Sequence, residues 1–296
     1  MTEQKPRPGL PKLIATDLDG TLVRSDDTVG PYTHEVLARV KAAGIPIVGA
    51  TGRGPRLIEL VRADIPAADF LVMGGGSRVV DLTDPDTPLV LRDERLDGEA
   101  LADLLATLEH EVGPLSVMVE AGDESGAPLW GDVHPAWRYP EVVEARVRAD
   151  ALTGRVIKGF AYHDSYDADE LLALARRLID PSVATVTQAG LGYIEICPPG
   201  VDKASGLAVV AQTLGVDPDD VLVFGDMPND LPMFAWAGFA RVAVANAHVD
   251  VLAAADQVTL SNDADGVAVY LDAILAPMTA TTLTPTTMTA TPMTAC

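Results

Sequence analysis

The sequence predicts an α/β protein in which a parallel sheet, covered by helices on both faces, is interrupted by an inserted α+β unit. Short apolar runs typical of buried strands alternate with segments of helical period in the first and last thirds of the chain. The middle third lacks this alternation. Polar turns follow several of the apolar runs directly, at the strand ends where open α/β sheets bind ligands.

The first part of the core is expected over residues 12–83, after a lead-in at 1–11 that contains three prolines. The expected elements are, in order, a strand at 13–16, a helix at 32–43, a strand at 46–50, a helix around 57–61 and a strand at 70–73. The strands are apolar throughout, whereas the first helix places Val36, Leu37 and Val40 on one side. This order of elements predicts neighbouring parallel strands.

Residues 84–190 are expected to form the inserted unit. The segment begins with a proline- and aspartate-rich stretch at 84–88. It continues with a helix that carries leucines at helical spacing, namely Leu101, Leu104, Leu105 and Leu108. Strands at 116–120 and 183–186 and a second helix around 171–178 follow. This mixture of strands and helices indicates an α+β unit separate from the core.

The α/β pattern returns over residues 191–276. The expected elements are a strand at 193–196, a helix at 202–214, strands at 221–224 and 240–244, and a closing helix around 267–274. The last stretch, 277–296, consists of repeats of Met, Thr, Ala and Pro without any charge. It shows no period of apolar residues and predicts a disordered tail.

The overall composition limits the classes of function. Hydrophobic residues make up 48% of the 296 residues, which is enough for a core of useful size. The formal net charge of −22 argues against nucleic acid or an anionic membrane as a partner, because both require a basic patch. A small anionic substrate is still compatible with this charge, since a bound metal ion reverses the field locally.

The cysteines and the N-terminus favour a cytoplasmic enzyme. The two cysteines, Cys197 and Cys296, form no C-x-x-C pattern and no disulfide framework, which fits a reducing compartment. The first residues contain no apolar run of the kind found in a signal peptide. We expect no transmembrane helix, because no stretch of about 18 apolar residues occurs.

Two aspartates follow the first predicted strand, in the segment Asp17-Leu18-Asp19-Gly20-Thr21. Charge at the end of a buried strand is costly to bury, which favours a functional role for Asp17 and Asp19. An ordinary turn is the alternative interpretation, because Asp and Gly are common turn residues.

Two further motifs could hold an anion. Thr51 and Gly52 follow the second strand, where a hydroxyl and an accessible backbone N–H make an anion seat near a helix N-terminus, although Thr51 could also be a plain N-cap. Lys203 lies in the first turn of a later helix, where the helix dipole disfavours a cation. A surface lysine is the simpler explanation for Lys203.

The fourth motif follows the strand at 221–224 and contains Asp226, Asn229 and Asp230. Such an oxygen-rich turn suits Mg²⁺, which binds carboxylates and retains several waters. An acidic helix N-terminus would also be stable without a metal ion. Because all four motifs fall in order at the same expected edge of the sheet, we expect them to form one site.

Together the four motifs resemble those of the haloacid dehalogenase (HAD) superfamily, in its Cof-type, sugar-phosphatase-like branch. The matching segments are DLDGTL at 17–22, TGR at 51–53, GVDKASGL at 200–207 and GDMPNDLPM at 225–233, and the resemblance covers residues 12–276. An insert between the second and third motifs is similar to the C2B class of cap domain. The resemblance implies a Rossmann-like core with a smaller cap over the site.

The resemblance also implies a Mg²⁺-dependent phosphohydrolase. Asp17 would attack phosphorus to form an aspartyl-phosphate, and Asp19 would protonate the leaving oxygen and then activate water. The implied Mg²⁺ ligands are the Asp17 side chain, the Asp19 backbone carbonyl and the Asp226 side chain. The residues expected to hold the phosphoryl group or substrate are Thr51, Gly52, Arg53, Lys203 and Asn229. Asp230 is expected to support this set by steadying Lys203.

The expected substrate is a small phosphorylated metabolite, with a sugar phosphate as the first hypothesis. Within the insert, His134 and Trp137 are hypothesised to set specificity, with packing inside the small unit as the alternative. The chain departs from the family at Gly74-Gly75-Gly76, where the family often has an Asn. A substrate contact made by that Asn is therefore not predicted for this chain.

Two other functions stay open on the sequence. A phosphomutase shares the core and the aspartyl-phosphate and differs in the fate of that intermediate. A non-catalytic phospholigand sensor, similar to a receiver domain, also has an aspartate at a strand end. Receiver domains are short and have no cap, so Asp19 and the large insert argue against a sensor.

Overall fold

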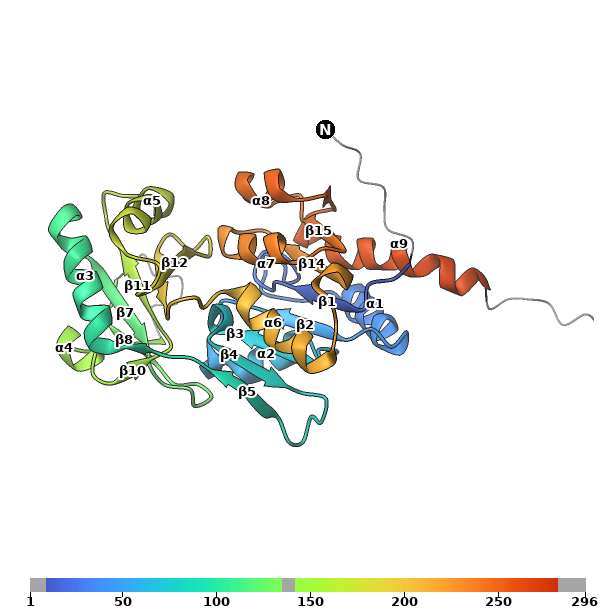
Figure 1. The fold of residues 1–296 in the computed structure, drawn as a ribbon, viewed down its shortest axis with the longest axis horizontal. Helices are drawn as coiled ribbons and strands as arrows, with labels where there is room; N and C mark the ends of the chain where they lie inside the picture. Colours follow the sequence, from blue (N-terminus) through green and yellow to red (C-terminus); the bar gives the residue numbers. More distant parts are fainter. Residues whose placement is uncertain (1–8, 135–141, 282–296) are drawn as a thin grey trace, which may run out of the picture.

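The computed structural model describes residues 9–134 and 142–281, which form two parts side by side (Figure 1). The larger part contains an eight-stranded sheet with the strand order β16-β15-β14-β1-β2-β3-β4-β5. Its strands are β1 (Leu13–Thr16), β2 (Ile47–Ala50), β3 (Phe70–Met73), β4 (Arg78–Asp81), β5 (Leu89–Asp93), β14 (Val221–Gly225), β15 (Ala240–Ala243) and β16 (Gln257–Val258).

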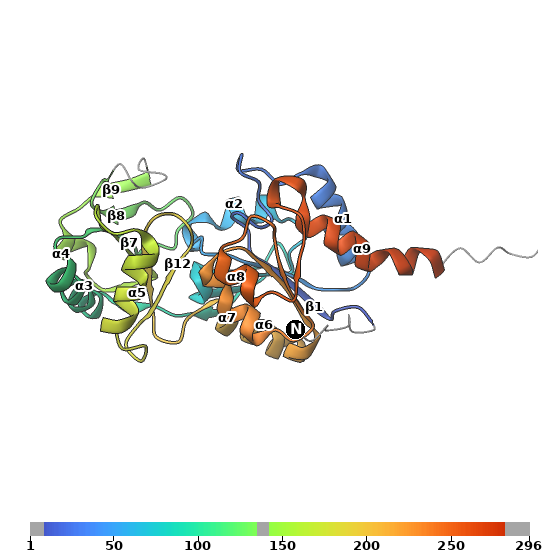
Figure 2. The ribbon, with the colours of Figure 1, turned by 90° about the horizontal axis from the view of Figure 1, so that it is seen from above.

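Helices cover both faces of this sheet (Figure 2). One face packs against α1 (Pro31–Ala42), α2 (Ile58–Asp64) and α9 (Gly266–Thr281), and the other against α6 (Lys203–Leu214), α7 (Leu231–Trp236) and α8 (Val249–Ala254). Alternate residues of β1 serve the two layers, because Ile14 packs with the first set of helices and Leu13 and Ala15 with the second. This two-sided burial explains why the strands are apolar along their whole length.

The predicted Rossmann-like core is confirmed, with an antiparallel edge that the sequence did not predict. The strands from β16 to β3 run parallel to their neighbours, whereas β4 and β5 pair antiparallel. Because β5 belongs to this sheet, the predicted boundary of the core at 83 lies too early. The proline- and aspartate-rich stretch at 84–88 is the connection between β4 and β5 and does not lead into the insert.

The smaller part is built on a six-stranded sheet with the order β12-β13-β11-β7-β8-β9 (Figure 1). These strands are β7 (Ser116–Glu120), β8 (Leu129–Gly131), β9 (Val143–Ala145), β11 (Lys158–Tyr162), β12 (Thr185–Gln188) and β13 (Ile194–Cys197). Helices α3 (Gly98–Val112), α4 (Arg148–Ala151) and α5 (Ala168–Leu178) pack on one face of the sheet. The short strands β6 (Leu96–Asp97) and β10 (Arg155–Val156) pair separately.

The second boundary of the insert also differs from the prediction. The sequence places the strand around 193–196 in the core, but β13 pairs with β11 and β12 of the smaller sheet. An apolar run carries no signal that tells one sheet from the other, and this explains the error. We therefore call residues 94–197 the inserted unit, in place of the predicted 84–190.

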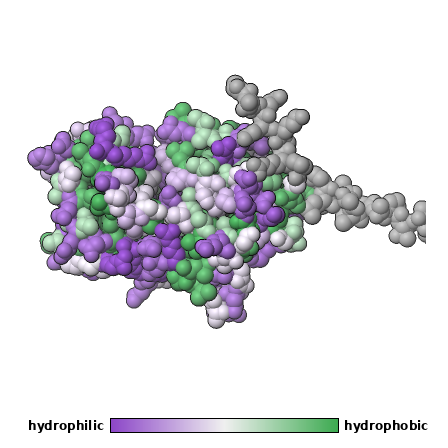
Figure 3. Space-filling view, viewed as in Figure 1, coloured by the Kyte–Doolittle hydropathy of each residue, from purple (hydrophilic) through white to green (hydrophobic). Residues whose placement is uncertain are grey.

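The C-terminal helix extends further than predicted. α9 continues to Thr281, past residue 277 where the sequence predicted an irregular tail to begin, and residues 282–296 lie outside the described part of the chain. No helix within the described ranges is long and apolar enough to cross a membrane. Hydrophilic side chains are spread over much of the face shown in Figure 3, in keeping with the net charge of −22.

Candidate active site

A cavity of about 370 Å³ lies between the carboxyl edge of the core sheet and the inserted unit. Asp17, Asp19 and Gly52 line it from the core, and Met118 and Phe160 line it from the inserted unit. Its volume is in the range of small-molecule binding sites. The first, second and fourth motifs, which lie far apart in the sequence, therefore meet at one pocket, and the inserted unit forms one of its walls.

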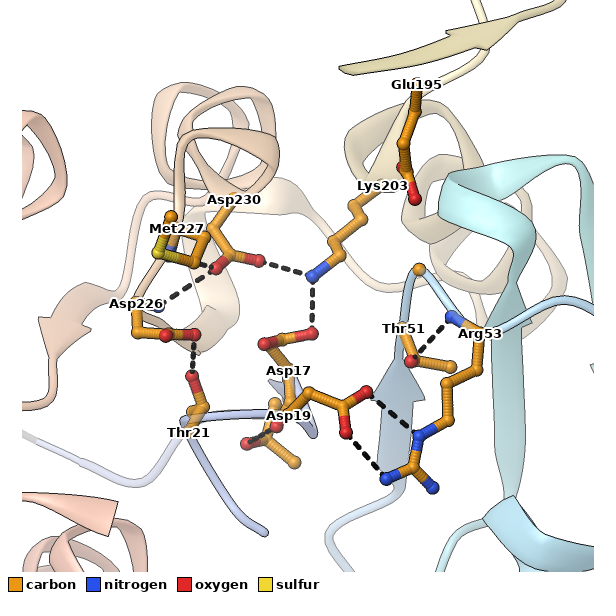
Figure 4. A network of polar contacts seen from close by, with 12 residues as sticks. Asp17, Asp19, Thr21, Thr51, Arg53, Glu195, Lys203, Asp226, Met227 and Asp230 are labelled. Carbon is orange, nitrogen blue, oxygen red and sulfur yellow. Dashed lines mark hydrogen bonds and ion pairs between the residues drawn. The ribbon is translucent and has the colours of Figure 1, made fainter. Parts of the chain in front are cut away.

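Lys203 lies at the centre of the polar residues of this site (Figure 4). Its Nζ donates to Asp17 Oδ1 at 2.5 Å and to Asp230 Oδ1 at 2.6 Å. The lysine is only 1% exposed, which excludes the alternative of a surface lysine. Its position follows from the start of α6, where the Asp202 side chain accepts from the Ser205 N–H at 2.7 Å and caps the helix.

The turn after β14 is closed by Asp230. Its Oδ2 accepts the backbone N–H groups of Asp226 at 2.9 Å and Met227 at 3.0 Å. The Thr21 hydroxyl donates to Asp226 Oδ1 at 2.8 Å and so joins the first motif to the fourth (Figure 4). Asp230 thus contacts both the turn and Lys203.

The carboxylates of Asp17, Asp226 and Asp230 fit a divalent cation. They are buried, and each offers an oxygen within 4.8 Å of the others. Burial raises the pKa of Asp17 well above its ordinary value. Burial, together with repulsion from Asp230, raises the pKa of Asp226 to about 6. Lys203 brings one positive charge against three carboxylates, so a hard divalent cation would balance the excess negative charge.

The Asp19 side chain points away from these three carboxylates, toward Arg53 (Figure 4). Arg53 Nη2 donates to Asp19 Oδ1 at 2.6 Å and Nε donates to Oδ2 at 2.9 Å, while Nη1 donates to Asp64 at 2.5 Å. The guanidinium that the sequence predicted to bind phosphate or substrate is thus paired with two carboxylates. The predicted metal contact through the Asp19 backbone carbonyl stays a prediction.

Thr51 and Gly52 form a turn at the end of β2. The Thr51 hydroxyl accepts the Arg53 N–H at 3.0 Å, and α2 begins only at Ile58. Thr51 is therefore not the N-cap of that helix, which was the alternative interpretation. Asn229 also lines the cavity, and its Oδ1 has no hydrogen-bond partner within the described residues. Such an atom is available to a ligand or to water.

The three glycines at 74–76 support the turn that carries Thr51. The N–H of Gly74 donates to the Arg53 carbonyl at 2.8 Å, and the N–H of Gly75 donates to the Thr51 carbonyl at 3.0 Å. Gly76 has φ +112°, and a Cβ there would lie 2.1 Å from the Asp202 carbonyl oxygen. The departure from the family pattern thus coincides with close packing against the start of α6.

Among the described residues, the aromatic side chains that line the cavity do not include His134. Phe160 and Tyr193 line it, with their rings 5.4 Å apart in an edge-to-face arrangement. His134, in the part of the chain that the structure describes, does not line the cavity, and its ring lies 4.8 Å from that of Tyr162. Trp137 lies outside the described residues.

Three charged residues of the inserted unit line the cavity and were missed in the sequence, namely Glu120, Lys158 and Glu195. Each is at most 2% exposed. The signal was present, because each occurs in a run that otherwise reads as a buried strand, where an ionised side chain needs a partner. Reading every charged residue in such a run as a candidate would have found them.

The chain is similar in sequence to two proteins that are named as phosphatases. The chain is 27% identical over 292 residues to 5-amino-6-(5-phospho-D-ribitylamino)uracil phosphatase YwtE of Bacillus subtilis, covering 90% of this chain and 98% of the relative. It is 29% identical over 235 residues to the HMP-PP phosphatase of an Enterobacter species, covering 77% of this chain and 82% of the relative.

The fold is shared with solved structures. The crystal structure of SMU.1108c from Streptococcus mutans matches with a TM-score of 0.76 at 22% identity, covering 90% of this chain and 99% of that protein. The sequence profile of the family described as haloacid dehalogenase-like hydrolase matches residues 14–271. The chain therefore belongs to the haloacid dehalogenase-like hydrolases.

Proposed function

We propose that this chain is a Mg²⁺-dependent phosphatase that hydrolyses a small phosphomonoester, with a sugar phosphate as the first candidate, through an aspartyl-phosphate on Asp17. One observation carries the proposal. Asp17 is buried at the end of β1, with its carboxylate held by Lys203 and within 4.8 Å of the Asp226 carboxylate. A carboxylate fixed at a pocket in this way is suited to nucleophilic attack.

The residues around Asp17 have separate roles in the proposed reaction. Lys203 orients one oxygen of Asp17, and the other attacks phosphorus as the ester P–O bond breaks. Thr51, the Gly52 N–H and Lys203 would hold the phosphoryl oxygens. Asp19, whose side chain is 38% exposed, gives its proton to the leaving oxygen and later takes a proton from the water that cleaves the acyl phosphate.

The residues that would hold the metal are the side chains of Asp17 and Asp226 and the backbone carbonyl of Asp19. A bound Mg²⁺ supplies charge neutralisation for the phosphoryl group. Asp230 keeps the Asp226 turn closed and shares Lys203 with Asp17. The three carboxylates and one lysine therefore form a preorganised seat for a dianionic phosphate together with a divalent cation.

The two relatives support the substrate class. One is named for a phosphorylated ribitylaminouracil and the other for HMP-PP, and both names describe phosphatases. Small phosphorylated metabolites are therefore the class that we assign to this chain. The cavity of about 370 Å³ has room for a leaving group of this size beside the phosphoryl group.

Replacing the proposed nucleophile is the direct test. We expect Asp17→Asn to lower kcat for 4-nitrophenyl phosphate with Mg²⁺ by about 10³-fold or more, because an amide does not form the acyl phosphate. The exposed Asp86→Asn is the matched control and should retain full activity. Chelation of the metal should abolish turnover reversibly. Full turnover by Asp17→Asn would rule out the mechanism.

Product analysis with a hexose phosphate separates the proposed function from its rivals. The proposal predicts that inorganic phosphate is released. An isomerised ester would show a phosphomutase instead. The absence of any turnover by the wild-type protein with Mg²⁺ across a broad panel of phosphate esters would favour a sensor.

A further inference from the structure

The inserted unit presents one face of its sheet to the cavity. On β7 and β11, alternate residues point to opposite faces, so Met118 and Glu120 share the cavity side, as do Lys158 and Phe160. The intervening residues of β7 pack against α3 and α5. Glu120 and Lys158 therefore lie on the face of the sheet that forms a wall of the cavity, opposite the residues proposed to hold the phosphoryl group.

Three charged side chains from neighbouring strands gather on this wall, and we call Glu120, Lys158 and Glu195 the wall triad. Glu120 and Lys158 are directly opposite each other in the pairing of β7 and β11. Lys158 Nζ donates to Glu195 Oε1 at 2.6 Å and to the Gly52 carbonyl at 2.6 Å. The triad therefore touches the same turn that is proposed to hold the phosphoryl group.

The triad packs closely on the turn of the core. A Cβ built on Gly54 would lie 1.8 Å from Glu120 Oε1, so this carboxylate packs directly against the glycine. A Cβ on Gly52 would lie 3.8 Å from Glu195 Oε1 and 3.9 Å from Lys158 Nζ. A phosphate ester seated at Gly52 thus has its leaving group beside these charges.

Two acceptor atoms of the triad are buried without a hydrogen bond. Glu120 Oε1 and Glu195 Oε2 have no hydrogen-bond partner among the residues that the structure describes, and the cation nearest Glu120 Oε1 is Arg56, at 3.5 Å. Leaving a buried carboxylate oxygen unpaired is costly, so such atoms in a pocket call for a ligand or water that donates to them. Burial also raises the pKa of Glu120.

The charges of the triad and its neighbour balance. Glu120 and Glu195 are matched by Lys158 and Arg56, so this wall offers no excess charge for a second phosphate or for a cationic group. The rest of the wall is apolar and aromatic, with Met118, Phe160 and Tyr193 buried in one cluster. The wall therefore suits a neutral group that carries hydrogen-bond donors and one apolar face.

We propose that the wall triad binds the leaving group of the substrate, and that this leaving group is uncharged and donates hydroxyl or N–H hydrogen bonds to Glu120 and Glu195. The inference rests on the proposed phosphatase function. It adds that specificity is set by these residues of β7 and β13 and not by His134, while Trp137 lies outside the described residues. Esters with a second phosphate are disfavoured.

The test measures binding without turnover, in the Asp17→Asn protein with Mg²⁺. The ligands are D-ribose 5-phosphate, D-glucose 6-phosphate, phenyl phosphate, which has no donor on its leaving group, and inorganic phosphate. Calorimetry gives the Kd of each ligand for the Asp17→Asn protein. The same measurement is made for two double variants, in which Glu120→Gln or Glu195→Gln is combined with Asp17→Asn. Glu111→Gln, an exposed position on α3, is the matched control. Thermal melts confirm that each variant is folded.

We expect a hydroxylated ester to bind more tightly than inorganic phosphate. Each triad variant should raise the Kd of that ester by about 10-fold or more, which is the usual loss for a hydrogen bond to a charged group. The Kd values for phenyl phosphate and inorganic phosphate should change less than about twofold, because the phosphoryl seat is untouched.

Three results would overturn the inference. In the first, neither sugar phosphate binds more tightly than inorganic phosphate. In the second, the triad variants leave the Kd values of the sugar phosphates unchanged. In the third, the triad variants raise the Kd of inorganic phosphate as much as that of the sugar phosphates, which would show that the triad has only a structural role. Failure of the proposed function looks different, since the wild-type protein would then not turn over 4-nitrophenyl phosphate at all.

Discussion

At the scale of residues, the site is a set of charged and mostly buried side chains in which each carboxylate has a hydrogen-bond partner. Asp17 is held by Lys203, Asp226 by the Thr21 hydroxyl, and Asp19 by Arg53. Burial raises the pKa of Asp17 and Asp226 despite the nearby Lys203, because the ionised form of each carboxylate is poorly solvated there. We therefore expect metal binding at this cluster to depend on pH.

The metal-free protein should lose stability as the pH rises toward neutrality. The pKa of Asp226 in the folded state, about 6, lies above the ordinary value of 3.8, so the folded state binds this proton more tightly. The resulting stability is complete below pH 3.8 and is lost as the pH rises through about 6. Mg²⁺ competes with the proton, so its stabilising effect should grow over the same range.

Thermal melts with and without Mg²⁺ check this expectation. The rise in Tm on adding Mg²⁺ should be larger at about pH 7.5 than at about pH 5. Asp226→Asn should remove most of that rise at both values. An equal rise at both pH values in the wild-type protein would contradict the coupling.

The candidate site residues of the core could be predicted from the sequence, but the side chains with which they pair could not. Asp17, Asp19 and Asp226 were singled out because each follows an apolar run at a strand end, and Lys203 because it is a cation in the first turn of a helix; both rules depend only on local order. The pairing of Arg53 with Asp19 depends on how two turns from different strands approach each other. Spacing along the chain does not encode that approach, so Arg53 was predicted to bind substrate.

At the scale of elements, the start of α6 positions the central lysine. Lys203 is the first residue of the helix, and Asp202 caps it through the Ser205 N–H. The same type of cap occurs on α3 in the inserted unit, where the Asp97 side chain accepts from the Glu99 N–H at 2.9 Å. The two caps are chemically alike, and only one of them lies next to the site.

This difference gives a matched pair of substitutions. Asp202→Ala and Asp97→Ala should each lower the free energy of unfolding by about 1 kcal/mol, the usual loss for an N-cap. Only Asp202→Ala should also lower kcat/KM, because fraying of the first turn moves Lys203. Denaturant unfolding and steady-state kinetics of both variants measure the two effects. Equal activity in the two variants would show that the cap does not position the lysine.

Elements were also where the domain boundaries were misread. The strand that became β13 was predicted for the core sheet but pairs in the smaller sheet, whereas residues 89–93, which form β5 of the core sheet, were placed in the insert with no strand predicted there. Strand pairing over long separations is decided by which edge is free in the folded chain, and a single apolar run does not carry that information. The type of the element at β13 was predicted correctly, whereas its partner strands were not.

At the scale of the whole molecule, the cavity exists only because two parts meet. The core supplies the carboxylates and Lys203, and the inserted unit supplies the wall triad, with Lys158 joined to the Gly52 carbonyl across the junction. The prediction of a hydrolase of this family is confirmed by the profile match over residues 14–271. In the proposed reaction, the core residues carry the chemistry and the inserted unit sets the choice of substrate.

The central claim is that Asp17 carries the phosphoryl group during the reaction. The most direct measurement is the mass of an Asp19→Asn variant quenched in acid after mixing with 4-nitrophenyl phosphate and Mg²⁺. This ester has a good leaving group that needs no protonation, so the first step should proceed, while hydrolysis of the acyl phosphate lacks its base. We predict one added phosphoryl group, located on Asp17 by peptide mapping. Release of 4-nitrophenol with no adduct, or with an adduct on another residue, would contradict the account.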